Sequence, residues 1–257
     1  MFKYLNRRVV ALVVLLLVLA MMIFSRTTEL LSHEDEKADA SAQTDVDLIL
    51  PPYIDGAVTR RAYDDLPDID IDSWEYLLVN QAHNCGAYAP DVVQIEGTSS
   101  YFEIRAIDKL YALLDASKAA GFDPHVYVGY RAYVIQADQY RAQVAQLVNK
   151  GYSQADAERE AAEISSEPGT SEHQTGLCID LVDRYTESLA DYQMDPTFEA
   201  WLNDHVAEYG FIMRYPENKV SVTGRYEPWH IRYVGEEAAK FMTEHNLTLE
   251  EFVTLYH

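Results

Sequence analysis

An unbroken apolar run near the start of the chain is the feature that most restricts how this protein can fold. Lys3, Arg7 and Arg8 precede the run, which extends from Val9 to Phe24. As a helix rising about 1.5 Å per residue, its sixteen residues span about 24 Å, approaching the ~30 Å hydrocarbon core of a bilayer. Because a basic flank belongs on the cytoplasmic side, everything after the run is predicted to be exported.

The segment after the run favours an uncleaved signal-anchor over a secretory signal peptide. Residues 25–28 read Ser-Arg-Thr-Thr, which is not a small-x-small cleavage site, and no cysteine lies nearby to carry a lipid. Residues 1–26 are therefore predicted to form a cytoplasmic tip and a single transmembrane signal-anchor, with secretion after cleavage as the alternative. Residues 27–52 are polar, acidic and aperiodic, which predicts a flexible stalk. The folded domain would then cover residues 53–257.

The distribution of charged residues changes at the end of the predicted anchor, near residue 26. The protein has 42 acidic and 20 basic residues, a net charge of −22. Four of the basic residues and none of the acidic ones lie in residues 1–26, so the remainder carries 16 − 42 = −26. Such an acidic body argues against nucleic acid as a partner, because phosphate binding requires clusters of lysine and arginine.

Residues 53–257 show helical and strand patterns in an irregular order. Helical periodicity, with glycine stops or caps, predicts helices over residues 104–120, 133–150, 154–164, 196–209, 236–245 and 248–256. Apolar and β-branched runs predict strands over residues 74–80, 125–129, 177–182, 211–214 and 229–234. Since the order lacks a regular βαβ alternation, the predicted fold class is α+β.

Three segments combine residue types that bind metals or move protons. They are Gly129-Tyr130-Arg131, Ser171 to Asp180, and Glu227 to His230. Asp180 lies in an apolar run, where a carboxylate is costly unless it is paired or bound to a metal. With His173 and His230 it would form a three-ligand site with an open position, which is typical of catalytic zinc. Glu227 would then be placed to act as a general base.

Each segment alone also has a simple structural interpretation. A His-x6-Asp pair can be hydrogen-bonded in a core, a Glu-x-x-His pair is common on surfaces, and Gly-Tyr-Arg can end a strand with a solvated arginine. Only the combination favours a catalytic metal site. A structural zinc site with four cysteines is excluded, because the chain has two.

In this order, the three segments resemble the VanY-like D-alanyl-D-alanine carboxypeptidases, zinc peptidases of bacterial cell-wall metabolism. The family pattern is an SGYR-type segment, an SxHxxGxAxD segment and a later ExxH segment, which correspond here to Val128 to Arg131, Ser171 to Asp180, and Glu227 to His230. The resemblance covers about residues 74–245. It implies a VanY-like, hedgehog-type DD-peptidase fold, with a small, mostly antiparallel sheet flanked by helices.

The resemblance also implies a role for each residue of the metal centre. His173, Asp180 and His230 would bind one Zn²⁺ ion. Glu227 would activate a water molecule and later return a proton to the leaving amine.

Four further residues are implied to contact the substrate. Arg131 would stabilise the oxyanion or hold a substrate carboxylate, and a planar bidentate donor suits either task. Gln136 and Ser171 would line the pocket and bind the terminal D-residue. Trp229 would form a wall of the site, although its sequence context also fits a buried core tryptophan.

The implied function is removal of the terminal D-Ala from peptidoglycan stem peptides by a membrane-anchored, monomeric zinc carboxypeptidase outside the bacterial cell. L,D-carboxypeptidase action on tetrapeptide stems is the nearest alternative, because relatives with the same segments do either. A non-catalytic wall-binding or sensor domain is a third reading, although such a domain should have lost a metal ligand or the base.

Two positions depart from the family pattern. Val128 stands where the family often has Ser, and Cys178 stands where it often has Ala. Because the domain is predicted to be exported, a disulfide between Cys178 and Cys85 is permitted. Two free thiols are the equally open alternative.

Overall fold

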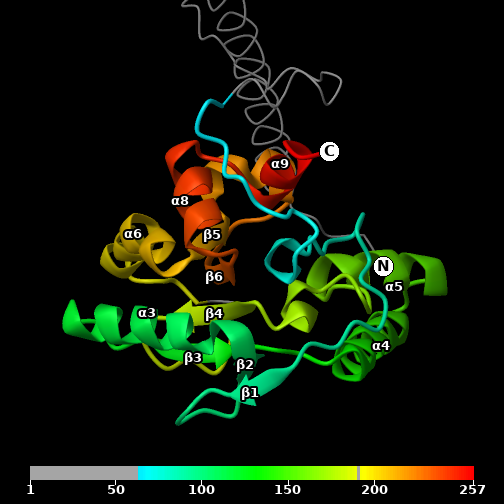
Figure 1. Cartoon of the computed structure of the whole chain (residues 1–257). Coiled ribbons are helices and arrows are strands. Elements are labelled where there is room, and N and C mark those ends of the chain that lie inside the picture. Colours follow the sequence, from blue (N-terminus) through cyan, green and yellow to red (C-terminus); the bar gives the residue numbers. More distant parts are fainter. Residues whose placement is uncertain (1–62, 190–191) are drawn as a thin grey trace, which may run out of the picture. The chain divides into compact units, whose positions relative to one another are not determined.

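The computed structural model describes residues 63–189 and 192–257 of the chain, and Figure 1 shows their elements coloured in chain order. The predicted signal-anchor, the predicted stalk and the boundaries at residues 26 and 52 lie outside this part. Within it, no helix is both long enough and apolar enough to cross a membrane.

An antiparallel sheet of four strands lies at the centre of the fold. Its strands are β3 (His125–Val128), β4 (Cys178–Val182), β5 (Phe211–Tyr215) and β6 (Glu227–Tyr233), in the order β3-β4-β6-β5. Strands β1 (Val92–Gln94) and β2 (Tyr101–Glu103) pair separately as a short hairpin. Together with the helices around them, these sheets confirm the predicted α+β class and its small antiparallel sheet.

Helices flank the four-stranded sheet (Figure 1). The α-helices are α3 (Ile107–Ala119), α4 (Tyr133–Asn149), α5 (Gln154–Ile164), α6 (Pro196–His205), α7 (Val220–Thr223), α8 (Glu236–Glu244) and α9 (Leu249–Thr254). Short 3₁₀ turns are η1 (Trp74–Tyr76), η2 (Ile104–Ala106), η3 (Glu172–Thr175), η4 (Val206–Tyr209) and η5 (Glu217–Lys219). The six predicted helices are thus confirmed, with a 3₁₀ turn replacing the first turn before α3 and the last turn after α6.

Local capping explains several of these boundaries. The side chain of Ser153 accepts a hydrogen bond from the backbone N–H of Asp156 at the start of α5. Thr248 and Glu251 form a reciprocal capping box at the start of α9, as their spacing in the sequence predicts. Capping side chains satisfy backbone N–H groups that the first turn of a helix leaves without partners.

The prediction of a strand over residues 74–80 is wrong. This segment begins as η1 and continues without a strand partner, apart from an isolated bridge between Asn80 and His83. The carbonyl groups of Glu75 and Leu77 instead accept hydrogen bonds from the buried guanidinium of Arg232, at 2.8 and 3.0 Å. Arg232, which is distant in the sequence, therefore fixes the position of this segment, and the residues of the segment do not indicate this contact. The β1–β2 hairpin and α7 were also not predicted.

Two apolar clusters hold the sheet between helices. One joins residues of α3 and α6 to inward-facing strand residues such as Ile179, Leu181 and Ile231. The other joins α8 and α9 to Ile212 and Val234. Helices α4 and α5 lie side by side and pack through a small cluster of their own (Figure 1). On β4 and β6, the residues that alternate with the first cluster include Cys178, Asp180, His230 and Arg232, and this polar group leads to the candidate site.

Candidate metal centre and substrate cleft

The pairing of β4 with β6 brings two of the predicted ligands together. Asp180 lies directly opposite His230 in the antiparallel register, and Cys178 lies opposite Arg232. Alternate residues of a strand point to opposite faces, so these four side chains share one face of the sheet. All four are buried.

The third predicted ligand, His173, approaches from η3, immediately before β4. The turn ends at Gly176, whose φ of +71° is a left-handed conformation that favours glycine. A second glycine, Gly129, allows the backbone at Tyr101 to approach closely, because a Cβ atom on residue 129 would lie 2.4 Å from the carbonyl oxygen of Tyr101. The carbonyl of Gly129 in turn accepts a hydrogen bond from His173 Nδ1, at 2.9 Å. The glycine of the Gly-Tyr-Arg segment thus orients a predicted ligand.

The free nitrogen of each imidazole faces Asp180. His173 Nε2 lies 3.5 Å from Asp180 Oδ2, and His230 Nδ1 lies 3.0 Å from Asp180 Oδ1. The remaining nitrogens have other partners: Gly129 O for His173 Nδ1, and Glu172 Oε2, at 2.9 Å, for His230 Nε2. Asp180 Oδ1 is buried without a hydrogen bond of acceptable geometry in the described part of the chain. Two imidazoles and a carboxylate with an unused oxygen form a donor set that fits Zn²⁺.

Cys178 offers a second combination of donors. His173, Cys178 and His230 each present one donor atom within 4.8 Å of the others. However, Cys178 Sγ lies 3.5 Å from His173 Nδ1, the nitrogen that also contacts Gly129. Because the nitrogens that remain available face Asp180, the carboxylate set explains the geometry better, and Cys178 lies behind His173.

The charges of this cluster favour ionised acids beside protonated imidazoles in the metal-free protein. Burial alone would lower the pKa of His173, but Cys178 and Asp180 raise it to about 9. Burial would raise the pKa of Asp180, but the two histidines hold it well below its usual range. The pKa of His230 is raised in the same way, against burial, by Cys178, Asp180 and Glu172. A metal ion bound here would therefore displace protons from the imidazoles.

Glu227, the predicted base, opens β6 beside these groups. Its Oε2 atom lies 3.6 Å from His230 Nδ1, and its side chain is 25% exposed. Its other oxygen lies 3.5 Å from Arg225 Nη1. Glu227 therefore has access both to the candidate metal centre and to the solvent.

A cleft of about 790 Å³ opens onto these residues. Besides the three proposed metal ligands, four predicted site residues line it: Arg131, Ser171, Glu227 and Trp229. Trp229 also packs against the apolar cluster of α3 and α6, so both interpretations of this residue hold.

Gln136 does not have the predicted position. It is fully buried and is not among the residues that line the cleft. Its Oε1 atom accepts a hydrogen bond from Arg131 Nη1 at 2.9 Å, while its amide donates to Ser165 Oγ and to the carbonyl of Ser166. Gln136 therefore orients Arg131 from behind the cleft lining.

The disulfide that the sequence leaves open is not formed. Cys85 and Cys178 are both free thiols. The side chain of Cys178 lies on the polar face of β4 and contacts His173 Nδ1, the nitrogen that does not face Asp180.

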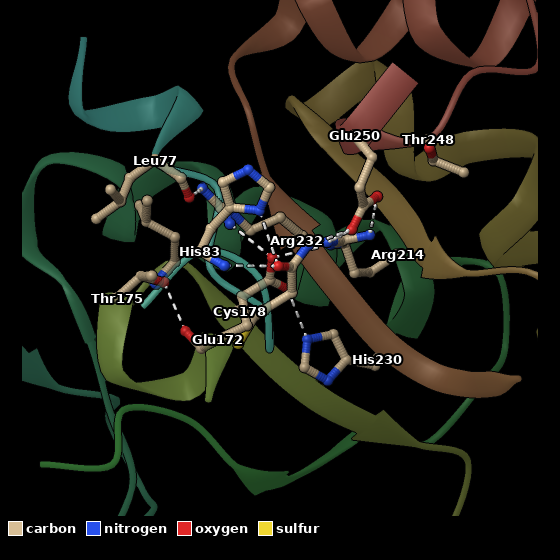
Figure 2. Close-up of polar contacts among 12 residues, drawn as sticks. Leu77, His83, Glu172, Thr175, Cys178, Arg214, His230, Arg232, Thr248 and Glu250 are labelled. Atoms are coloured by element: carbon tan, nitrogen blue, oxygen red, sulfur yellow. Dashed lines mark hydrogen bonds and ion pairs between the residues drawn. The ribbon is translucent and has the colours of Figure 1, made fainter. Parts of the chain in front are cut away.

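Four charged residues behind His230 were not predicted from the sequence as site residues: Glu172, Arg214, Arg232 and Glu250. Figure 2 shows their contacts, in which Glu172 lies between His230 and the two guanidinium groups. The sequence does contain an indication that the two arginines are buried and paired. Like Asp180, each lies within an apolar strand, where a charged side chain requires a partner.

Comparison with known proteins identifies the family. The profile of VanY, D-alanyl-D-alanine carboxypeptidase, matches residues 99–236. The chain belongs to the VanY family. A D-alanyl-D-alanine carboxypeptidase of Enterococcus faecalis (strain ATCC 700802 / V583) is 36% identical over 72% of this chain and 67% of its own. YodJ of Bacillus subtilis (strain 168), named as a carboxypeptidase, is 40% identical over 59% of this chain but only 53% of its own. The matched region thus spans between half and two thirds of these VanY relatives.

Solved structures support the same VanY assignment. A vancomycin-resistance D,D-pentapeptidase VanY in complex with Zn(II) is 36% identical, with a TM-score of 0.59 over 70% of this chain and 99% of that one. The L,D-carboxypeptidase LdcB is 34% identical, with a TM-score of 0.57 over 73% of this chain and 92% of that one. The fold prediction is therefore confirmed, and both activities weighed from the sequence occur among proteins similar to this chain.

Proposed function

We propose that this protein is a zinc-dependent D,D-carboxypeptidase that removes the terminal D-Ala from peptidoglycan stem peptides. One observation carries the proposal. Asp180 Oδ1 is buried 3.0 Å from His230 Nδ1 without a hydrogen bond of acceptable geometry to any described residue, and Glu227 lies 3.6 Å from the same nitrogen and opens to a cleft. Membership of the VanY family and the D-alanyl-D-alanine carboxypeptidase of E. faecalis support this substrate class.

His173 Nε2, a carboxylate oxygen of Asp180 and His230 Nδ1 are the atoms that would hold the ion. Bound Zn²⁺ supplies a Lewis acid that polarises the scissile carbonyl and makes a water molecule more acidic. Hydrogen bonds to Gly129 and Glu172 fix the two imidazole rings, so little reorganisation is needed when the metal binds.

Glu227 moves the proton. Its carboxylate would accept a proton from the attacking water and later give it to the amine of the departing D-Ala. Its position at the mouth of the cleft allows both transfers, because it is part-exposed and close to the metal centre.

Arg131 would place a positive charge beside the bound substrate. Its guanidinium lines the cleft and is oriented by Gln136, while its backbone N–H donates to the carbonyl of His173 at 3.0 Å. It would therefore stabilise the negative oxygen that develops on the substrate, or hold a substrate carboxylate. Ser171 and Trp229 would contact the terminal D-residue.

L,D-carboxypeptidase action is the second candidate, supported by the similarity to LdcB. Mass spectrometry of the products from synthetic stem peptides distinguishes the two. D,D activity shortens a pentapeptide ending in D-Ala-D-Ala by one residue and leaves the tetrapeptide intact, whereas L,D activity cleaves the tetrapeptide. Chelation should abolish either reaction, and Zn²⁺ should restore it. Cleavage that persists without metal, or a zinc-loaded protein that cleaves neither peptide, would reject the proposal.

The place of action is a further part of the proposal. The basic flank and the apolar run from Val9 to Phe24 support a single-pass anchor in the bacterial membrane, with the folded domain outside. A monomeric state is part of the same proposal. Secretion after cleavage is the alternative. Mass spectrometry of the N-terminus in the membrane and culture fractions would decide between them.

A further inference from the structure

Glu172 is a buried carboxylate that takes no direct part in the proposed proton transfers or in holding the metal. Its Oε2 atom lies 2.9 Å from His230 Nε2, the nitrogen that does not face Asp180. Its Oε1 atom accepts hydrogen bonds from Arg214 Nε at 2.9 Å and from Arg232 Nη1 at 2.7 Å (Figure 2). The two oxygens of one carboxylate thus face different partners, an imidazole on one side and two guanidinium groups on the other.

The charges of this network balance without His230. Arg214 also donates to both oxygens of Glu250, at 2.9 and 2.6 Å. The other guanidinium contacts of Arg232 are backbone carbonyls, including that of Tyr233. Two carboxylates therefore face two guanidinium groups. Glu172 stays ionised in this setting without taking a proton from the imidazole.

This arrangement specifies which nitrogen of His230 carries the proton. Guanidinium groups only donate hydrogen bonds, so they require an acceptor at Oε1 of Glu172. The ionised carboxylate is also only an acceptor, so the nitrogen that faces Oε2 must be protonated. A neutral His230 is then protonated on Nε2 and has its lone pair on Nδ1, directed at Asp180.

We propose that Glu172 is a positioning residue for the metal, which holds His230 in the tautomer that can bind Zn²⁺ through Nδ1. The inference rests on the proposed zinc site but not on the identity of the peptide substrate. Arg214 and Arg232 take part indirectly, because they fix the orientation of the Glu172 carboxylate.

Replacing Glu172 by Gln separates this role from simple packing. In E172Q the guanidinium groups would still require an acceptor, so the amide oxygen should face them and the NH₂ group should face His230. The imidazole would then accept on Nε2 and carry its proton on Nδ1, where it competes with the metal. A side chain of nearly the same shape would thereby favour the wrong tautomer.

The test measures the Zn²⁺ dissociation constant of the full-length chain by competition with a chromophoric chelator. E172Q should bind Zn²⁺ about 10- to 100-fold more weakly than the wild type. E250Q is the matched control, because it removes the other carboxylate on Arg214 without touching His230, and its affinity should stay close to that of the wild type. Thermal unfolding of each metal-free variant reports its stability separately.

A third variant, E172A, distinguishes positioning from structural support. It leaves a cavity and removes the acceptor that Arg214 Nε and Arg232 Nη1 share, so it should lose more stability than E172Q. If Glu172 were only structural, zinc affinity would follow the same order. Positioning instead predicts that E172Q binds Zn²⁺ at least as weakly as E172A, because alanine does not impose the wrong tautomer.

Three results would overturn the inference: wild-type zinc affinity in E172Q, equal losses in E172Q and E250Q, or a loss that simply follows stability. Should E172Q fail to fold, ¹⁵N NMR of the zinc-loaded wild type decides the point. A slowly exchanging Nε2–H on His230 is expected, and Zn²⁺ bound to Nε2 would contradict it. A wild-type chain that binds no Zn²⁺ would reject the proposed function itself, which keeps the two failures distinct.

Discussion

Both faces of the central sheet are buried, but at the middle of β4 and β6 they carry opposite chemistry. On one face, Ile179 and Leu181 of β4 join Phe211, Ile231 and Tyr233 in the cluster beneath α3 and α6. On the other face, the same strands carry the metal-centre residues and the charged network behind them: Cys178, Asp180, Arg214, His230 and Arg232. Alternation along β4 and β6 is enough to separate the two sets.

The comparison shows that burial has different requirements on each face. The apolar face gains stability from the area it removes from water, and many side chains of suitable volume would serve. On the polar face every charge needs a specific partner, because an unpaired buried charge is far more costly than a lost apolar contact. Asp180 Oδ1 lies 3.0 Å from His230 Nδ1 but has no hydrogen bond of acceptable geometry within the described residues, and this exception points to a ligand. We therefore expect the apolar face to govern stability and the polar face to govern activity.

Removing the proposed base should have the largest effect on activity. Glu227→Gln keeps the size of the side chain but cannot accept the proton, so kcat should fall about 10²- to 10⁴-fold. Zinc content, measured by atomic absorption, should match that of the wild type, since Glu227 is not a proposed ligand. Glu208→Gln, at an exposed position, is the control for a lost carboxylate. Full activity in the Glu227 variant would reject its role.

A truncated side chain on the apolar face should lower the stability of the protein and leave its activity near that of the wild type. Leu181 is fully buried, so Leu181→Ala should lower the free energy of unfolding by about 2–5 kcal/mol. Chemical denaturation measures this loss, while kcat and zinc affinity, assayed well below the melting temperature, should stay near wild type. Leu147→Ala, in the separate cluster of α4 and α5, is a matched truncation away from the sheet. A tenfold loss of zinc affinity in the Leu181 variant alone would show that the two faces are coupled.

Features that are determined by residues close together in the sequence could be predicted. Apolar runs and caps are local, so β4 and the helices from α3 to α9 could be predicted, apart from the short α7. Asp180 could also be predicted as a functional residue, because it interrupts an apolar run.

The remainder depended on contacts between distant parts of the chain. Glu172 adjoins a recognised histidine, but its partners lie 42 to 60 residues away, so its role could not be predicted from spacing. Likewise, the segment after Trp74 is apolar enough to suggest a strand, yet its carbonyls are occupied by Arg232. Gln136 was recognised as important from the resemblance, whereas its actual partner, Arg131, required the fold.

Replacing Gln136 shows how far a buried polar residue affects kcat through its hydrogen bond to Arg131. Gln136→Ala removes the hydrogen bond to Arg131, and a bond to a charged group is worth about 1.5 kcal/mol, so kcat should fall about 10-fold. Because Arg131 itself remains, the effect should be much smaller than that of Arg131→Ala, and the double variant should be no worse than Arg131→Ala alone. Gln146→Ala, exposed on the same helix, is the control. Additive losses would indicate that Gln136 acts independently of Arg131.

The smallest effect should come from the cap of the C-terminal helix, which connects stability to the polar face. Thr248 Oγ1 accepts the N–H of Glu251, so Thr248→Ala should lower the free energy of unfolding by about 1 kcal/mol. Helix α9 also carries Glu250, which binds Arg214. If the helix only has to be present, zinc affinity should not change, because a loss of this size leaves α9 folded. Thr243→Ala, at an exposed position in α8, controls for a lost hydroxyl. Weaker zinc binding in Thr248→Ala, but not in Thr243→Ala, would mean that fraying of α9 reaches the metal centre through Glu250, Arg214 and Glu172.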